Sequence, residues 1–181
     1  KLAVFTPSYP TQNRVGNYFV KVRVDQYAKL GHEVCVFTYG PSNTSYESDG
    51  VLVVMGNAQY LAQKLDGFSF DRFLVHLIDR KIAWYILKRS CYAKCILWIH
   101  GFETMAWYRD KLIWKFNAKF LLGRARRAFF NIIEMSMMRL LILAARSKIK
   151  YIFVSQWMKR ISEADLFCKF QNYRIIPNPI N

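Results

Sequence analysis

Cysteine is scarce in this chain: there are four cysteines in 181 residues, and they are widely spaced. That number and spacing exclude a small disulfide-stapled domain and favour a reducing compartment such as the cytoplasm. No secretory signal is visible at the N-terminus, where the first residues indicate a buried strand. Hydrophobic residues make up 53% of the chain, which excludes an intrinsically disordered protein and predicts a single domain over residues 1–181.

Several catalytic and nucleotide-binding motifs are also missing. There is no G-x-S-x-G, no Walker A sequence and no G-x-G-x-x-G, which argues against hydrolases of that class, P-loop NTPases and ordinary dinucleotide-binding enzymes. Cys91, Cys95 and His100 are spaced like a metal motif, but Cys95 and His100 stand at opposite ends of one expected strand, about 16 Å apart. We therefore expect no metal site and no resident cofactor.

Acidic residues are few, 12 against 27 lysines and arginines, and the formal net charge is +15. The imbalance is local, because residues 71–160 hold 19 basic and 5 acidic side chains while the flanking segments are close to neutral. Such a block indicates an anionic partner: a nucleic acid, an anionic membrane or a phosphorylated ligand. A basic face that only keeps the protein soluble would have the same composition.

The most distinctive basic segment covers residues 111–150, which contain one glycine and no proline. Three lysines recur there every four residues, which places them on one helical face among aromatic and aliphatic side chains. Two interpretations stay open: two ordinary helices of an α/β domain, the second largely buried, or a basic and aromatic helix that rests on an anionic membrane. Residues 129–145 are apolar but too short and too charged to favour a membrane span. The candidate surface residues are Lys111, Lys115, Lys119, Arg124, Arg126 and Arg127.

The hydrophobic pattern alternates between strands and helices. Short apolar runs predict seven strands, over residues 2–6, 33–38, 51–55, 72–78, 95–99, 151–154 and 174–176. Apolar residues at helical spacing predict helices over 15–30 and 81–89 and a further one that begins at Ser155. Short strand–helix–strand units are crossover units of a parallel sheet. The sequence therefore predicts a doubly wound α/β fold, with a mostly parallel sheet of about seven strands and helices on both faces.

In such a sheet, ligands bind at the carboxyl ends of the strands, near the point where the strand order reverses. The first loop, which includes Asn13, Gly16 and Asn17, leads into a helix whose N–H groups and dipole favour an anionic group such as a diphosphate. A plain turn fits the same residues, because one glycine does not make a glycine-rich loop. Ser155 lies in another loop that belongs to this edge.

His100 and Glu103 follow the strongest apolar strand and form the other candidate site. A histidine at a strand end, followed by Gly101, is placed to hydrogen-bond a sugar hydroxyl or a phosphate oxygen, and Glu103 is placed to accept from hydroxyls. A histidine that only caps a turn is the alternative. His76 lies inside an apolar strand and is expected to be a core residue, and His32 is expected to be structural.

Five segments, in order, carry a resemblance to a known family. They are KLAVFTPSYP at the first strand; YAKLGHEVCVFT, which follows the pattern LA..L...GH.V.V.T; DRFLVHLI, similar to D-x-x-h-x-H; ILWIHGFE, similar to H-G-x-E; and YIFVSQWMKR with YRIIPNPIN, similar to V-S-x-x-h-K and I-P-N-G. Together they cover the chain and resemble the N-terminal, Rossmann-like domain of GT-B glycosyltransferases of family 4, which are retaining enzymes. The chain departs from the family at Gly16, where two adjacent glycines are usual, and at Pro179, which replaces a glycine.

The resemblance implies the acceptor-binding half of an enzyme that moves a sugar from a nucleotide-sugar donor to a glycan or lipid-linked acceptor, for cell-surface polysaccharide or lipopolysaccharide synthesis. It implies retained anomeric configuration, no essential metal, and a leaving group stabilised by a helix dipole and basic residues. His100 would line the reaction centre, with Glu103 on the acceptor side, Gly16 near the donor phosphates and Asn178 at the hinge. The family's C-terminal domain, with the nucleotide-sugar pocket and a Glu-x7-Glu motif, would begin where this chain ends, so we expect this part alone to be inactive.

The basic block then suits an enzyme of the cytoplasm that binds peripherally at the inner face of the membrane and works on membrane glycans. Two other classes stay open. One is a nucleic-acid-binding module whose aromatic side chains would stack on bases, although no RRM, KH, OB or helix-turn-helix signature is visible. The other is a non-catalytic α/β interaction domain whose ligand loops have decayed.

Overall fold

The computed structural model describes residues 1–11, 16–101, 103–109 and 118–178, with the backbone alone described at 118–122 and 124. The strands are β1 (Leu2–Thr6), β2 (Val34–Tyr39), β3 (Thr44–Ser48), β4 (Val51–Gly56), β5 (Arg72–His76), β6 (Cys95–Ile99), β7 (Lys150–Phe153) and β8 (Tyr173–Ile175). The α-helices are α1 (Tyr18–Lys29), α2 (Ala58–Gly67), α3 (Arg80–Arg89), α4 (Ala118–Ala145) and α5 (Gln156–Leu166). Two short 3-10 helices are η1 (Tyr92–Lys94) and η2 (Trp107–Arg109).

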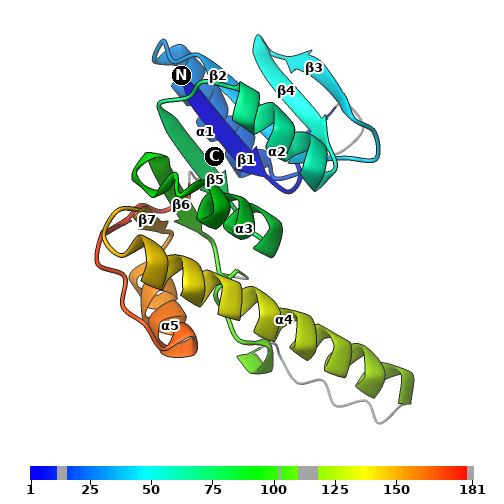
Figure 1. The fold of residues 1–181 in the computed structure, drawn as a ribbon, viewed down its shortest axis with the longest axis vertical. Helices are drawn as coiled ribbons and strands as arrows, with labels where there is room; N and C mark the ends of the chain where they lie inside the picture. The colour runs from blue at the N-terminus through cyan, green and yellow to red at the C-terminus, as the bar shows by residue number, and fades with distance from the viewer. Residues whose placement is uncertain (12–15, 102, 110–117, 179–181) are drawn as a thin grey trace.

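The eight strands of the described chain form one sheet in the order β3-β4-β2-β1-β5-β6-β7-β8, and every pair is parallel except β3 with β4. The chain builds the sheet in one direction through β2 and β4 and then in the other through β5 to β8, so the order reverses between β1 and β5 (Figure 1). This confirms the predicted doubly wound α/β fold. The carboxyl ends of β1 and β5 lie side by side at the reversal, where such folds bind ligands.

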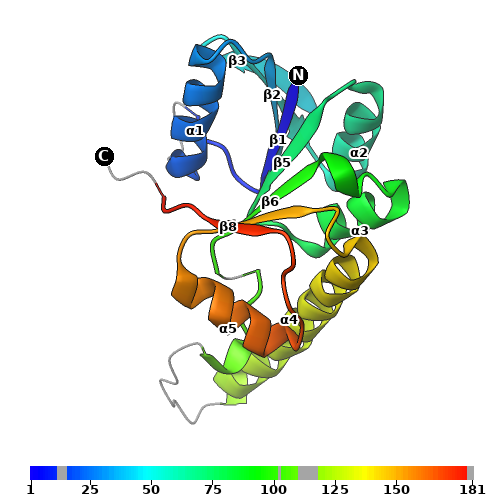
Figure 2. The same cartoon turned by 90° about the vertical axis from the view of Figure 1, so that its left-hand side faces the viewer.

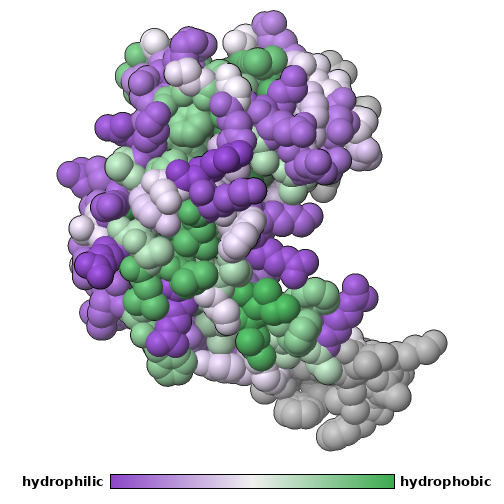
Figure 3. Space-filling model, viewed as in Figure 1, coloured by the Kyte–Doolittle hydropathy of each residue, from purple (hydrophilic) through white to green (hydrophobic). Residues whose placement is uncertain are grey.

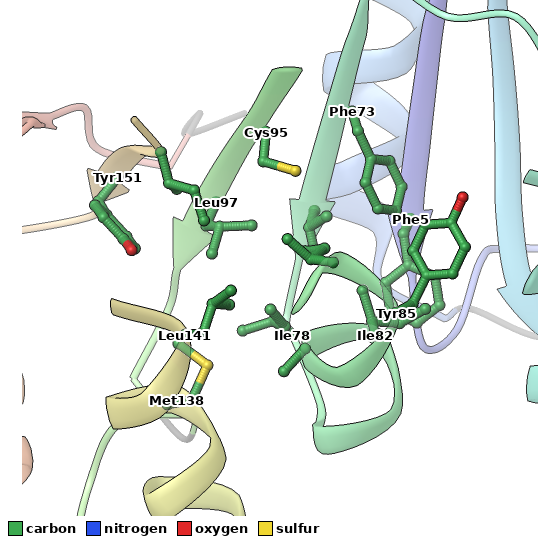
Figure 4. Close-up of a cluster of buried hydrophobic side chains, with 14 of the residues drawn as sticks. Phe5, Phe73, Ile78, Ile82, Tyr85, Cys95, Leu97, Met138, Leu141 and Tyr151 are labelled. Atoms are coloured by element: carbon green, nitrogen blue, oxygen red, sulfur yellow. The ribbon is translucent and has the colours of Figure 1, made fainter. Parts of the chain in front are cut away.

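Helices cover the sheet on both faces, with α1 on one side and α2, α3 and α4 on the other (Figure 2). Val4 of β1 belongs to a buried cluster with Val20 of α1. The next residue, Phe5, belongs to a larger cluster on the opposite face with Leu61 of α2. Figure 4 shows Phe5 in this cluster with Tyr85 of α3 and Leu141 of α4. Because both faces of the central strands are buried, these strands are continuous apolar runs, which is the pattern that made them predictable.

Two elements near the sheet edge are not predicted by the hydrophobic pattern. Strand β3 is polar and mostly exposed, because it pairs on one side only with β4. Its position is set by a tight hairpin at Asp49 and Gly50, which both have positive φ, of 50° and 78°. Helix α2 begins at Asn57, whose side chain accepts a hydrogen bond from the Tyr60 N–H. An Asp-Gly turn and an Asn cap were the available signals for these two elements.

Helix α4 is a single helix of 28 residues, so the expectation of two separate helices in this segment is wrong for its described part. The segment has no proline, and Gly123 alone does not break a helix. The C-terminal half packs on the body through Met138, Leu141 and Ala145, which are buried. The N-terminal half projects beyond the sheet (Figure 1). Ala118–Ala145 is therefore not the largely buried helix that one interpretation expected.

The outward face of α4 is apolar as well. Phe129, Ile132, Leu140 and Leu143 are 61%, 56%, 49% and 57% exposed, and their spacing places them on one side of the helix, opposite the buried residues. Figure 3 shows hydrophobic surface over α4, next to hydrophilic side chains. The sequence predicts no membrane span here, because residues 129–145 are too short and too charged, but the helix extends further toward its N-terminus. Ala125–Ala145 is long and apolar enough to cross a bilayer by length and composition alone, with 22% buried. One such helix does not place the protein in or out of a membrane.

Candidate functional site

Helix α1 brings side chains from β5 and β6 together at the reversal of strand order. Its Phe19 and Arg23 are one turn apart and therefore project from the same face. The Phe19 ring packs on His76 and His100, with centroids 6.4 and 4.6 Å apart. The Arg23 guanidinium lies 3.6 Å above the centre of the Trp98 ring. We call these five residues the switch-point cluster.

Strand register explains how the three rings from the sheet meet. His76 is the last residue of β5, and Trp98 is its register partner on β6, so their rings stack with centroids 5.4 Å apart and 17° between planes. His100 follows two residues after Trp98 and faces the same side. Nδ1 of His76 lies 3.3 Å from Nε2 of His100, within hydrogen-bond distance. His76 is thus the core residue that was expected, but it also contacts the candidate catalytic histidine.

Both histidines are held neutral at neutral pH. Burial lowers the pKa of His76 well below its usual value, and His100 and Arg23 lower it further. Burial also lowers the pKa of His100 to about 4, and the Arg23 charge acts in the same direction. Burial lowers the pKa of Arg23 as well, but a guanidinium remains charged in proteins. The cluster therefore combines two neutral imidazoles with one cation.

Four nitrogens of the cluster are buried and have no hydrogen-bond partner among the described residues. They are Arg23 Nε, His76 Nε2, Trp98 Nε1 and His100 Nδ1. The nitrogens of Arg23 and Trp98 are obligate donors. Buried polar atoms are normally paired, so these four unpaired nitrogens, at the edge where doubly wound sheets bind ligands, make the cluster a candidate binding site.

The first loop is tied to β1 by Asn17, whose Nδ2 donates to Thr6 Oγ1 over 2.9 Å. Gly16 has a φ of 53°, and a Cβ there would lie 2.7 Å from the Tyr9 carbonyl carbon, so the loop closes only on a glycine. Among the described residues, no side chain caps the first turn of α1, which leaves its N–H groups suited to an anion. Phosphate binding by Gly16 and Asn17 stays a prediction, and Asn13 lies outside the described residues.

Glu103 is turned inward, with 8% of the residue exposed. Its carboxylate accepts from the backbone N–H groups of His100, over 3.2 Å, and Gly101, over 2.7 Å. Burial raises the pKa of Glu103 to about 7, although both hydrogen bonds act in the opposite direction. Gly101 has a φ of 138°, and a Cβ there would come within 2.7 Å of Met158. Glu103 therefore shapes the turn that presents His100, and its catalytic assignment stays a prediction.

Ser155 and Asn178 differ in their relation to the cluster. The Ser155 hydroxyl oxygen accepts from the Met158 N–H over 3.1 Å and so caps α5. In the C-terminal tail, Asn178 Oδ1 and the Pro177 carbonyl accept from the same terminal nitrogen of Arg23, over 3.3 and 3.2 Å. The structure therefore joins Asn178 to the switch-point cluster, whereas it uses the Ser155 hydroxyl as a helix cap.

The predicted basic surface is only partly described. The residues or side chains that lie outside the description are Lys111, Lys115, Lys119 and Arg124. Arg126 lies over the Phe130 ring, 5.7 Å from its centre. Together with Arg127 and Trp107 it lines a pocket of about 640 Å³ between η2 and α4. Arg109, also in this lining, is bound to the buried Asp165.

The residues that link the site were not predicted from the sequence. Phe19, Arg23 and Trp98 were not candidates, because an aromatic or basic residue on an amphipathic helix or in a strand has no special signature. The spacing of Phe19 and Arg23 was an available signal, as was the alternation that puts Trp98 and His100 on one face. No group of three His, Cys, Asp or Glu residues in the described part of the chain is arranged to hold a metal ion.

Comparison with protein-family models and with curated proteins gives no match to this sequence. The likeness to GT-B glycosyltransferases therefore rests on the five sequence segments, and the fold is compatible with it.

Proposed function

We propose that this chain is the acceptor-side domain of a retaining glycosyltransferase of the GT-B type, which transfers a sugar from a nucleotide-sugar to a glycan or lipid-linked acceptor. The observation that supports this proposal is the convergence of predicted cleft residues on α1 at the reversal of strand order. Asn17 is the N-cap residue of the helix, His100 contacts its Phe19, and Asn178 contacts its Arg23. These three residues are far apart in the chain, and the sequence alone predicts each of them as a cleft residue.

The chemistry of the cluster suits the stabilisation of a diphosphate leaving group. Arg23 supplies a positive charge, and the N-terminus of α1 supplies partial positive charge and N–H donors. Burial keeps His100 neutral, so it acts through a hydrogen bond and not through charge. The second domain that this family carries would bind the nucleotide and supply most of the contacts to the donor.

The test is turnover of nucleotide-sugars by the full-length protein, measured as release of nucleoside diphosphate from a panel of uridine and guanosine diphosphate sugars. We expect His100→Ala to reduce turnover by at least about tenfold, the loss typical of one catalytic hydrogen bond. His32→Ala is the matched control, because His32 is exposed in the turn before β2, at the amino-terminal edge of the sheet. Wild-type turnover by the His100 variant, or robust transfer by residues 1–181 alone, would refute the assignment.

The partner that we propose for the basic region is an anionic membrane surface. The exposed stripe of Phe129, Ile132, Leu140 and Leu143 would enter the interface, and Arg126 and Arg139 flank it on the helix, as in helices that lie on membranes. The buried C-terminal half of α4 argues for this arrangement over a span, because a span would require Leu141 and its neighbours to leave the core.

Vesicle binding tests this part of the proposal. We expect binding to vesicles that contain anionic lipid, weakened by salt, and none to neutral vesicles. Leu143→Asp should reduce binding, whereas the same charge change at exposed Leu52 of the distant β4 should not. Equal binding to both vesicle types would remove the membrane proposal, and a salt-dependent complex with single-stranded RNA would favour the nucleic-acid alternative.

A further inference from the structure

An open groove runs along α3, which lies between α2 and α4 (Figure 1). Residues of all three helices line this one cavity of about 520 Å³, which we call the α3 groove. That volume lies within the range of small-molecule sites, about 300–1,000 Å³. The apolar side chains of the lining come from each helix: Ala58 and Ala62 of α2, Ile82 and Tyr85 of α3, and Ile133 and Met137 of α4.

The charged side chains in the described lining of the groove are all basic and all belong to α3. They are Arg80, Lys81, Lys88 and Arg89. Asp66 of α2 accepts from Arg89, and Arg80 lies near Glu134, so the net charge of the groove comes from the two lysines. Lys81 and Lys88 are exposed and lie two helical turns apart on the same face of α3. The groove therefore combines apolar walls with an excess of positive charge.

The groove is continuous with the exposed apolar face of α4. Its Ile133 is next to Ile132, and its Met137 is three residues from Leu140, so these side chains adjoin on the helix surface. Figure 3 shows hydrophilic side chains over α3 next to the hydrophobic surface of α4. Trp84 of α3 lies between the two lysines and is 58% exposed. An indole beside basic side chains is typical of the boundary between lipid headgroups and acyl chains.

We propose that the α3 groove binds one anionic phospholipid of the membrane, with an acyl chain against the apolar lining and the phosphate at Lys81 and Lys88. Charge complementarity selects an anionic headgroup, and the apolar lining selects a hydrocarbon chain. That the lipid comes from a bilayer rests on the membrane surface proposed above. An acidic amphipathic helix of a partner protein would share this chemistry, but the continuity of the groove with the outer face of α4 favours the lipid, because it gives a chain an apolar path from the bilayer.

The direct test is titration of the full-length protein with phosphatidylglycerol whose acyl chains are short enough to keep it monomeric. Native mass spectrometry measures the number of lipids bound, and calorimetry measures the affinity. We expect one lipid per protein, and at least about fivefold weaker binding of phosphatidylcholine with the same chains, the effect of about one favourable charge at the headgroup. Failure to form a one-to-one complex, or equal affinity for the two lipids, overturns the proposal.

Two pairs of variants then locate the lipid. Lys88→Glu should weaken phosphatidylglycerol binding at least about fivefold, whereas Lys29→Glu, also in the last turn of a helix but on the opposite face of the sheet, should not. Trp84→Ser should weaken it about tenfold by removing apolar contact. Trp157→Ser is its control, because Trp157 of α5 is 59% exposed and lies outside the lining. Equal effects within either pair would place the lipid elsewhere and overturn the proposal.

Vesicle binding separates this proposal from the membrane proposal. If the protein binds anionic vesicles but forms no complex with monomeric phosphatidylglycerol, the groove proposal fails and the membrane surface stands. If it binds the monomeric lipid but no vesicles, the membrane surface fails and the groove stands. Neither measurement requires turnover, so both are independent of the proposed enzyme activity. Preference for an acidic amphipathic peptide over phosphatidylglycerol, lost in Trp84→Ser, would assign the groove to a partner helix and overturn the lipid.

Discussion

Replacing Glu103 by glutamine is expected to change how the stability of this protein depends on pH. The carboxyl is buried, and burial raises its pKa from 4.5 to about 7. The folded state therefore binds a proton more tightly than the unfolded state does. The contribution of this group to stability is complete below pH 4.5 and is lost as pH rises toward 7. Glutamine at this position has no such titration.

The magnitude follows from the two values and the two hydrogen bonds. Each pH unit between them changes the free energy of unfolding by about 1.4 kcal/mol, so the whole window amounts to about 3 kcal/mol. Glu103→Gln keeps the 2.7 Å bond from Gly101 through its carbonyl oxygen and loses the 3.2 Å bond from His100, at a cost of about 1 kcal/mol. The wild type is then the more stable protein near pH 4.5, and the variant is the more stable near pH 7.5.

The difference between the two proteins is the quantity to measure, because other groups titrate in the same window. His76 and His100 have lowered pKa values, so their contribution has the opposite sign: it is present above the unfolded pKa of 6.5 and is lost as pH falls. That contribution is common to wild type and variant and cancels in the difference. Urea unfolding of both proteins at several pH values between 4.5 and 7.5 measures this difference in the free energy of unfolding.

Glu47→Gln is the matched control, since this carboxylate is exposed on the edge strand β3 and should show no crossing of the two stability curves. A difference between wild type and Glu103→Gln that stays constant from pH 4.5 to 7.5 would refute the reasoning. It would mean that the buried carboxylate is ionised throughout, held by its two backbone donors against the cost of burial.

Three further stability changes are expected, each read by urea unfolding. Leu141→Ala should cost about 3 kcal/mol by opening a cavity where α4 meets the sheet. Leu140 is exposed, so Leu140→Ala should cost less than about 0.5 kcal/mol. Equal losses in the two variants would contradict the packing of this helix. Gly101→Ala should cost about 1–3 kcal/mol through its positive φ and blocked Cβ, whereas Gly67→Ala, with open space around it, should be neutral or stabilising. Asp165→Ala should cost about 3 kcal/mol, because this buried carboxylate accepts from the backbone and side chains of the η2 segment; a neutral result would show that η2 is held by other contacts.

The residues that carry chemistry were partly predictable. His100 was identified from its place after an apolar strand, because the carboxyl ends of parallel strands gather at one edge in any doubly wound sheet. The contact of His100 with His76, Phe19 and Arg23 was not predictable, since it depends on strand register and on which face of α1 meets the sheet. The inward turn of Glu103 was not predictable either, because it depends on backbone N–H groups whose direction is set by the φ of Gly101.

By itself, the sequence determined the alternation of strands and helices, the parallel sheet and the position of its ligand edge, because these depend on local periodicity and on general rules of chain connection. Tertiary structure alone decided the rest. It united His76, Trp98 and His100 under α1, because neighbouring strands set which side chains stack. The tertiary structure also decided that the N-terminal half of α4 projects and that the outer face of this helix is apolar and exposed. Helical periodicity shows that a helix forms but not which of its faces packs against the rest of the protein.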